Sequence, residues 1–124
     1  MMSGNVGKKE KYNWHKENSE LVSLINSGKV KEALVFGQEM VEYVDKKYKK
    51  DSKEKATTYN NMGMVFMLAG DYFLAEKCFH EALAMRKRLF GEKDNEVAVI
   101  FLNMVQLYKL QAQEIMMVNK VETN

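Results

Sequence analysis

The residue types that most often perform catalysis or bind metals are scarce in this sequence. Its one cysteine, Cys78, lies two positions before His80, and the other histidine, His15, is far away in the chain. Residues two apart on a helix face different directions, and two ligands are too few for a zinc site. The sequence also has no Ser-His-Asp, Cys-His-Asn or phosphate-binding glycine motif. We therefore predict a non-enzyme with no metal, no cofactor and no small-molecule substrate.

Asparagine side chains recur at a fixed spacing. Asn18 and Asn60 are 42 residues apart, and so are Asn61 and Asn103. Asparagine is unfavourable inside a helix because its side chain competes for backbone hydrogen bonds. Its amide, however, offers both a donor and an acceptor. These side chains could bind the backbone of a partner peptide or bridge neighbouring helices, and the sequence leaves both interpretations open.

Basic residues are concentrated in one segment. Six lysines lie between Lys46 and Lys55, and Arg86, Lys87 and Arg88 follow one period later. Cations complement the carbonyl ends of helices, acidic residues surround the lysines, and the net charge is only +2. No aromatic base-stacking motif accompanies them. Nucleic-acid binding through the Lys46–Lys55 cluster is therefore the less favoured alternative.

The elements that position these residues repeat along the chain. A shift of 42 residues places Gly28 on Gly70 and Ala33 on Ala75. Apolar residues at steps of three and four predict helices over 13–27, 30–48, 53–69, 72–89 and 94–118, with no β-strands. We expect a flexible leader over 1–12, one helical domain over 13–118 and a flexible tail over 119–124.

Two sets of residues resemble a known family. Tyr59, Met62, Gly63, Phe66, Ala75 and Phe79 are similar to the tetratricopeptide repeat pattern W-x₂-L-G-x₂-Y followed by A-x₃-F. A second set resembles the kinesin light chain type of this repeat. It comprises Ala82, Leu83, Met85, Arg86, Phe90, Gly91, Val97, Ala98, Asn103, Leu107 and Tyr108. The resemblance covers about residues 14–113. It implies an all-α solenoid of two and a half helix pairs, wound as a right-handed superhelix.

The resemblance also implies a function and a site. Proteins of this family bind other polypeptides in a concave groove lined by the first helix of each pair. The residues expected in that groove are Asn18, Thr57, Asn60, Asn61, Met64, Met67, Asn103, Gln106 and Lys109. We expect an adaptor that binds a peptide or helical segment of a protein partner there.

The last predicted helix is apolar on nearly every side. We expect Ala98, Phe101, Met104, Val105 and Tyr108 to face the core. The apolar residues then left for a homodimer interface are Val99, Ile100, Leu102, Leu107, Leu110 and Met117. A helix that is apolar all round is normally buried, so the second hypothesis is a self-associating scaffold in which Leu107→Glu gives a monomer. Folding back of residues 115–118 over this helix is an open alternative.

The expected location is the cytoplasm. The first residues have no apolar segment of the kind that a secretory signal needs. The longest mainly apolar stretch, Val97 to Leu110, is too short to cross a bilayer. We therefore expect no membrane partner.

Overall fold

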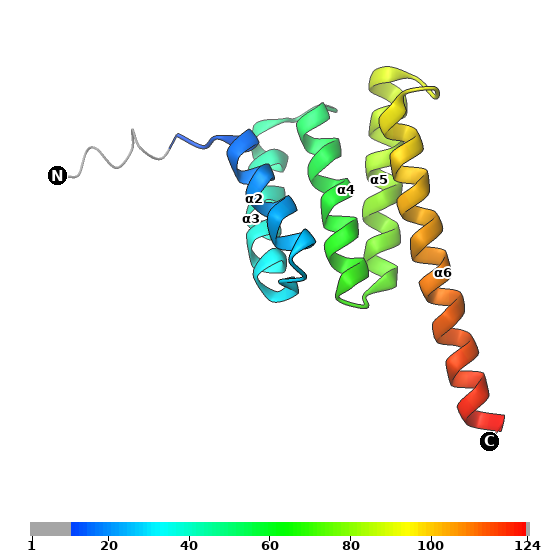
Figure 1. Cartoon of the computed structure of the whole chain (residues 1–124). Coiled ribbons are helices and arrows are strands. Elements are labelled where there is room, and N and C mark those ends of the chain that lie inside the picture. Colours follow the sequence, from blue (N-terminus) through cyan, green and yellow to red (C-terminus); the bar gives the residue numbers. More distant parts are fainter. Residues whose placement is uncertain (1–10, 124) are drawn as a thin grey trace.

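The computed structural model describes residues 11–123, with side chains as far as residue 120. This part of the chain is all-α and contains no β-strand. Its helices are α2 (Trp14–Asn26), α3 (Val30–Lys47), α4 (Lys53–Leu68), α5 (Tyr72–Phe90) and α6 (Asn95–Thr123). Each helix packs against the next one in the chain, α4 also contacts α2 and α6, and α6 extends well past the end of α5 (Figure 1). The predicted all-α arrangement of five helices, each packed on its neighbours, is confirmed for these residues.

Local signals explain where the helices begin and end. The side chains of Asn13, Ser52 and Asp71 each accept a hydrogen bond from the backbone N–H three residues later, which satisfies a donor in the first helical turn. Gly28 and Gly70 follow α2 and α4 with φ of 70° and 82°. Side chains other than glycine rarely adopt this left-handed conformation, so glycine makes the tight turn within each helix pair.

The core consists of two clusters that α4 joins. One contains Leu21, Met40 and Val65, and the other contains Phe79 and Leu107, all buried. Each cluster uses residues of α4, so this helix packs on both sides.

A buried polar contact fixes the first helix on α4. Thr58 is fully buried; its hydroxyl oxygen accepts a hydrogen bond from Trp14 Nε1 at 2.9 Å and donates one to the carbonyl oxygen of Glu54 at 2.8 Å. A buried hydroxyl without such partners would be destabilising. Both of its hydrogen-bonding roles are satisfied here, so the contact aligns α2 with α4.

The two chain ends differ from expectation. Tyr12, assigned to the flexible leader, stacks on Tyr43 with ring centroids 3.8 Å apart and packs against the first core cluster. The rest of that leader, residues 1–10, lies outside the described residues. The last helix continues to Thr123 rather than ending near residue 118, so residues 119–123 are helical and residues 115–118 do not fold back. No glycine or proline interrupts this stretch.

The predicted faces of α6 are corrected by the structure. The buried residues on this helix are Val97, Ile100, Met104 and Leu107. Of the residues expected to face the core, only Met104 does so; Ala98, Phe101, Val105 and Tyr108 are exposed.

This correction changes the proposed dimer interface. Ile100 and Leu107 are wrong as interface residues because they pack in the core with α5, and Leu110 packs against the same cluster. Val99, Leu102 and Met117 are exposed, as expected. A Leu107→Glu substitution would therefore bury a charge and unfold the protein rather than separate two folded subunits.

Candidate functional site

The recurring asparagines form hydrogen-bonded pairs between helices. Asn61 Nδ2 donates to Asn18 Oδ1 at 2.7 Å, joining α4 to α2. Asn103 Nδ2 donates to Asn60 Oδ1 at 3.0 Å, joining α6 to α4. Of the two interpretations that the sequence left open, bridging of adjacent repeats is present in the structure. We call these four residues the asparagine ladder.

The ladder has unused hydrogen-bonding capacity. Each pair uses one N–H of one amide and the oxygen of the other. Within residues 11–123, no other hydrogen bond involves the side-chain oxygens of Asn61 and Asn103. The same is true of the side-chain NH₂ groups of Asn18 and Asn60. All four side chains are half-buried rather than enclosed. The fold therefore holds a row of oriented donors and acceptors across three helices.

The other predicted groove residues divide into two groups. Thr57 and Met64 are half-buried, and Gln106 and Lys109 are exposed, so all four could contact a ligand. Met67 is buried in the second core cluster and is unavailable. The prediction that Met67 lines the groove is therefore wrong. Met67 lies one turn beyond Gly63 on the same side of α4, and this side packs against α5.

Several basic residues have structural roles. Arg88 Nε lies 2.6 Å from Asp51 Oδ2, and Arg86 lies 3.0 Å from Asp94, whose carboxylate also accepts from the N–H of Glu96 at the start of α6. The hydrogen bond from Arg88 holds the pKa of Asp51 below its usual value. These contacts tie helix ends together and explain part of the basic cluster without a nucleic acid.

The single cysteine lies beside an open cleft. Cys78 is half-buried and lines a space of about 290 Å³ with Tyr59, Met62 and Phe66. Burial, with a smaller contribution from the charge of Glu81, raises the pKa of this thiol to about 11. Since the thiolate is the reactive form, this environment suppresses its chemistry at neutral pH.

We expect Cys78 to react about a hundredfold more slowly with iodoacetamide at pH 8 than a thiol of pKa 9.0, because its pKa of about 11 leaves roughly a hundredth as much thiolate. Raising the pH toward 11 should restore most of the rate. The measurement is the alkylation time course by mass spectrometry, and the same chain in urea is the control. Rapid labelling of the folded protein at pH 8 would contradict the assignment.

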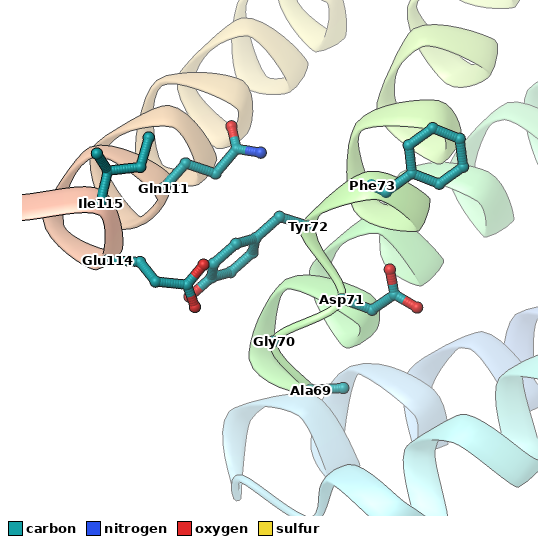
Figure 2. A pocket seen from close by; sticks show the side chains of 8 residues that line it. All are labelled: Ala69, Gly70, Asp71, Tyr72, Phe73, Gln111, Glu114 and Ile115. Carbon is teal, nitrogen blue, oxygen red and sulfur yellow. The ribbon is translucent and has the colours of Figure 1, made fainter. Parts of the chain in front are cut away.

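A larger cleft lies where α6 leaves the body of the molecule. It has a volume of about 700 Å³ and is bordered by the turn between α4 and α5 and by Gln111, Glu114 and Ile115 of α6. In Figure 2 the ring of Tyr72 points from α5 toward Glu114. Across residues 11–123, no three His, Cys, Asp or Glu side chains are placed to share a metal ion. Within the same range, no helix has the length and apolar character needed to cross a membrane.

Comparison with known proteins identifies the repeat. Residues 54–114 match the family model described as Tetratricopeptide repeat. No curated protein matches the chain. The matched segment begins in α4 and ends in α6, so it includes the Asn60–Asn103 pair.

Proposed function

We propose, from the premise that residues 54–114 place this chain in the tetratricopeptide repeat family, that it is a non-catalytic adaptor of the cytoplasm. Domains of this family are generally protein-interaction modules, so its partners are other polypeptides. The surface that we assign to a partner is the face of α2, α4 and α6 that contains the asparagine ladder.

One observation is the main support for this assignment. The ladder places four half-buried amides in a row across three helices, each with a donor or acceptor unused. The backbone of an extended peptide presents alternating N–H and C=O groups, which amides bind whatever the peptide sequence. Because the inter-helix bonds already fix the amide orientations, binding would cost little side-chain entropy.

The residues around the ladder would add affinity. Met64 offers an adaptable apolar contact beside Asn60. Gln106 and Lys109 border the ladder on α6 and are exposed, so they would select for polar or acidic groups in the ligand. A partner segment lying across α2, α4 and α6 is the arrangement that these side chains favour.

Site-specific photocrosslinking tests this proposal. A benzoylphenylalanine at position 106 should give covalent adducts with a polypeptide of another sequence when native lysate is irradiated. The matched control is the same substitution at Gln38, which is also an exposed glutamine but lies on α3 beside Cys78. Adducts are identified by mass spectrometry of their peptides.

The outcomes separate this proposal from self-association. Foreign peptides from position 106 and none from position 38 support the ladder face. Equal labelling at both positions, or no labelling at either, would argue against it. Adducts that contain only peptides of this chain would indicate contact between two copies instead.

A further inference from the structure

The exposed side of α6 has a regular apolar pattern. At alternating steps of three and four residues it presents Ala98, Phe101, Val105, Tyr108, Ala112 and Ile115, all of them exposed. This is the heptad spacing of a helix that packs along another helix. None of the six is charged. We call this row the α6 seam; it shares no residue with the asparagine ladder.

The repeat shows what kind of surface this is. One period earlier, Tyr59, Gly63 and Phe66 occupy the equivalent positions on α4, where they lie in the interface with α5. On α6, Lys87 of α5 lies over the ring of Phe101, and the hydroxyl of Tyr108 donates a hydrogen bond to Glu76 of α5. No further helix within residues 11–123 packs across this side of α6. Apart from these two side-chain contacts, the α6 seam is an interhelical surface on which no helix of residues 11–123 packs.

The α6 seam differs from the equivalent surface of α4 at one position, and this difference limits which helix can pack on the seam. The ring of Phe79 lies directly over Gly63, where an added Cβ would be only 2.5 Å from it. The equivalent residue on α6 is Val105, whose side chain fills that space. A helix packed as α5 packs on α4 would clash there, so the occupant must have a different pattern of large and small residues.

We propose that the helix packed on the α6 seam is α6 of a second copy. The two helices run antiparallel, and their two-fold axis crosses them at the level between residues 106 and 107. This register places Ala98 opposite Ile115, Phe101 opposite Ala112 and Val105 opposite Tyr108. Two of these layers set a large side chain against an alanine, which is how facing helices fill space without voids or strain. A two-fold interface is self-complementary, so each layer occurs twice and the seam forms six layers.

The parallel alternative fits less well. It would place Phe101 against Phe101 and Ala112 against Ala112, which alternates crowding with a void. Of these two arrangements, the antiparallel one pairs residues of unlike size along the seam.

The projecting half of α6 agrees with this arrangement. It extends beyond α5 (Figure 1), and Ile115 and Met116 on it are exposed. In the antiparallel register this half lies along the first turns of the other copy's α6, so each copy covers the surface that the other leaves open. Exposed apolar surface of this extent on a helix commonly marks an interface.

Disulfide trapping tests the register. In a Cys78→Ala background, the double variant Ala98→Cys, Ile115→Cys should form a disulfide-linked species of about twice 14.4 kDa on oxidation. The two positions are 17 residues apart on one helix, about 26 Å at about 1.5 Å per residue, so they cannot bridge within a chain. Neither single variant should cross-link, because the like positions are equally distant in an antiparallel pair. Cross-linking of Ala98→Cys alone would indicate a parallel pair and overturn the proposal.

Sedimentation equilibrium tests the surface itself. The wild type should form a dimer at micromolar concentration, and Val105→Glu should raise its dissociation constant by roughly a hundredfold or more, because it places two like charges in the centre of the seam. The matched control is Val35→Glu on α3, where the valine is 61% exposed compared with 54% for Val105. Circular dichroism should show unchanged helix content in both variants.

Two results would overturn the dimer. One is a monomeric wild type, which would leave the seam to a foreign helix or to further sequence of a longer chain. The other is a dimer that persists undiminished in Val105→Glu. Neither bears on the crosslinking experiment at Gln106, since the ladder face and the seam are different sides of α6.

Discussion

The Leu107→Ala variant is expected to lose about 2–5 kcal/mol of unfolding free energy. Leu107 is fully buried in the cluster that joins α6 to α5. Its truncation removes apolar contacts and leaves a cavity that the surrounding helices cannot fully close. Domains of this size are commonly stable by only about 5–15 kcal/mol, so the loss is a large fraction of the total. Urea denaturation followed by circular dichroism, at one fixed protein concentration, measures it.

The matched control for this prediction is Leu102→Ala on the same helix. Leu102 is 67% exposed, so its truncation should change stability by no more than about 0.5 kcal/mol. Equal effects at the two leucines would show that the buried face of α6 is misassigned. Leu107→Glu should give no folded protein at all, since an unpaired carboxylate would be buried.

The Gly63→Leu variant is expected to destabilise the protein by about 1–3 kcal/mol through overpacking. The added Cβ alone would lie 2.5–2.9 Å from three ring carbons of Phe79. That ring is fully buried, so it has little room to move. Leucine favours helix more than glycine does by about 1 kcal/mol, which offsets only part of the clash.

Thermal and urea unfolding of Gly63→Leu should be compared with those of Ser23→Leu. Ser23 is an exposed position in the last turn of α2 and offers room for a leucine. Its substitution should leave the midpoints nearly unchanged. If Gly63→Leu unfolded like the wild type, the close contact between α4 and α5 at this glycine would be ruled out.

A reduction of the clash should also recover stability. The double variant Gly63→Leu, Phe79→Ala removes the ring that the leucine meets. Its loss of stability should be smaller than the sum of the two single losses, because residues in contact are not additive. If the two losses of stability simply added, the leucine side chain would not be in contact with the ring of Phe79.

Much of this fold can be predicted from the sequence because its signals are local. The 42-residue period, the turn glycines Gly28 and Gly70 and the cap at Asp71 depend only on neighbouring residues. Helix bounds predicted from them agree with the structure within about two residues, except at the end of α6, where no stop signal is present. The small residue at position 63 was also readable, since Gly63 lies at a fixed place in the repeat pattern.

The partners of the asparagines could not be deduced in the same way. Their equal spacing showed that a common role was needed, but an amide can bind a ligand or a neighbouring helix equally well. Only the distance between α2, α4 and α6 decided that Asn61 bonds to Asn18 and Asn103 to Asn60.

The sequence by itself therefore determined the repeat, the helices and the absence of known catalytic motifs, while the tertiary structure decided which side of α6 is buried. A helix that is apolar on most sides has no single stripe to mark its core face. Burial then depends on which helix lies beside it. The side of α6 with Ile100 and Leu107 packs against α5. On the side with Phe101 and Val105, Lys87 of α5 reaches the ring of Phe101, but no further helix of residues 11–123 packs there.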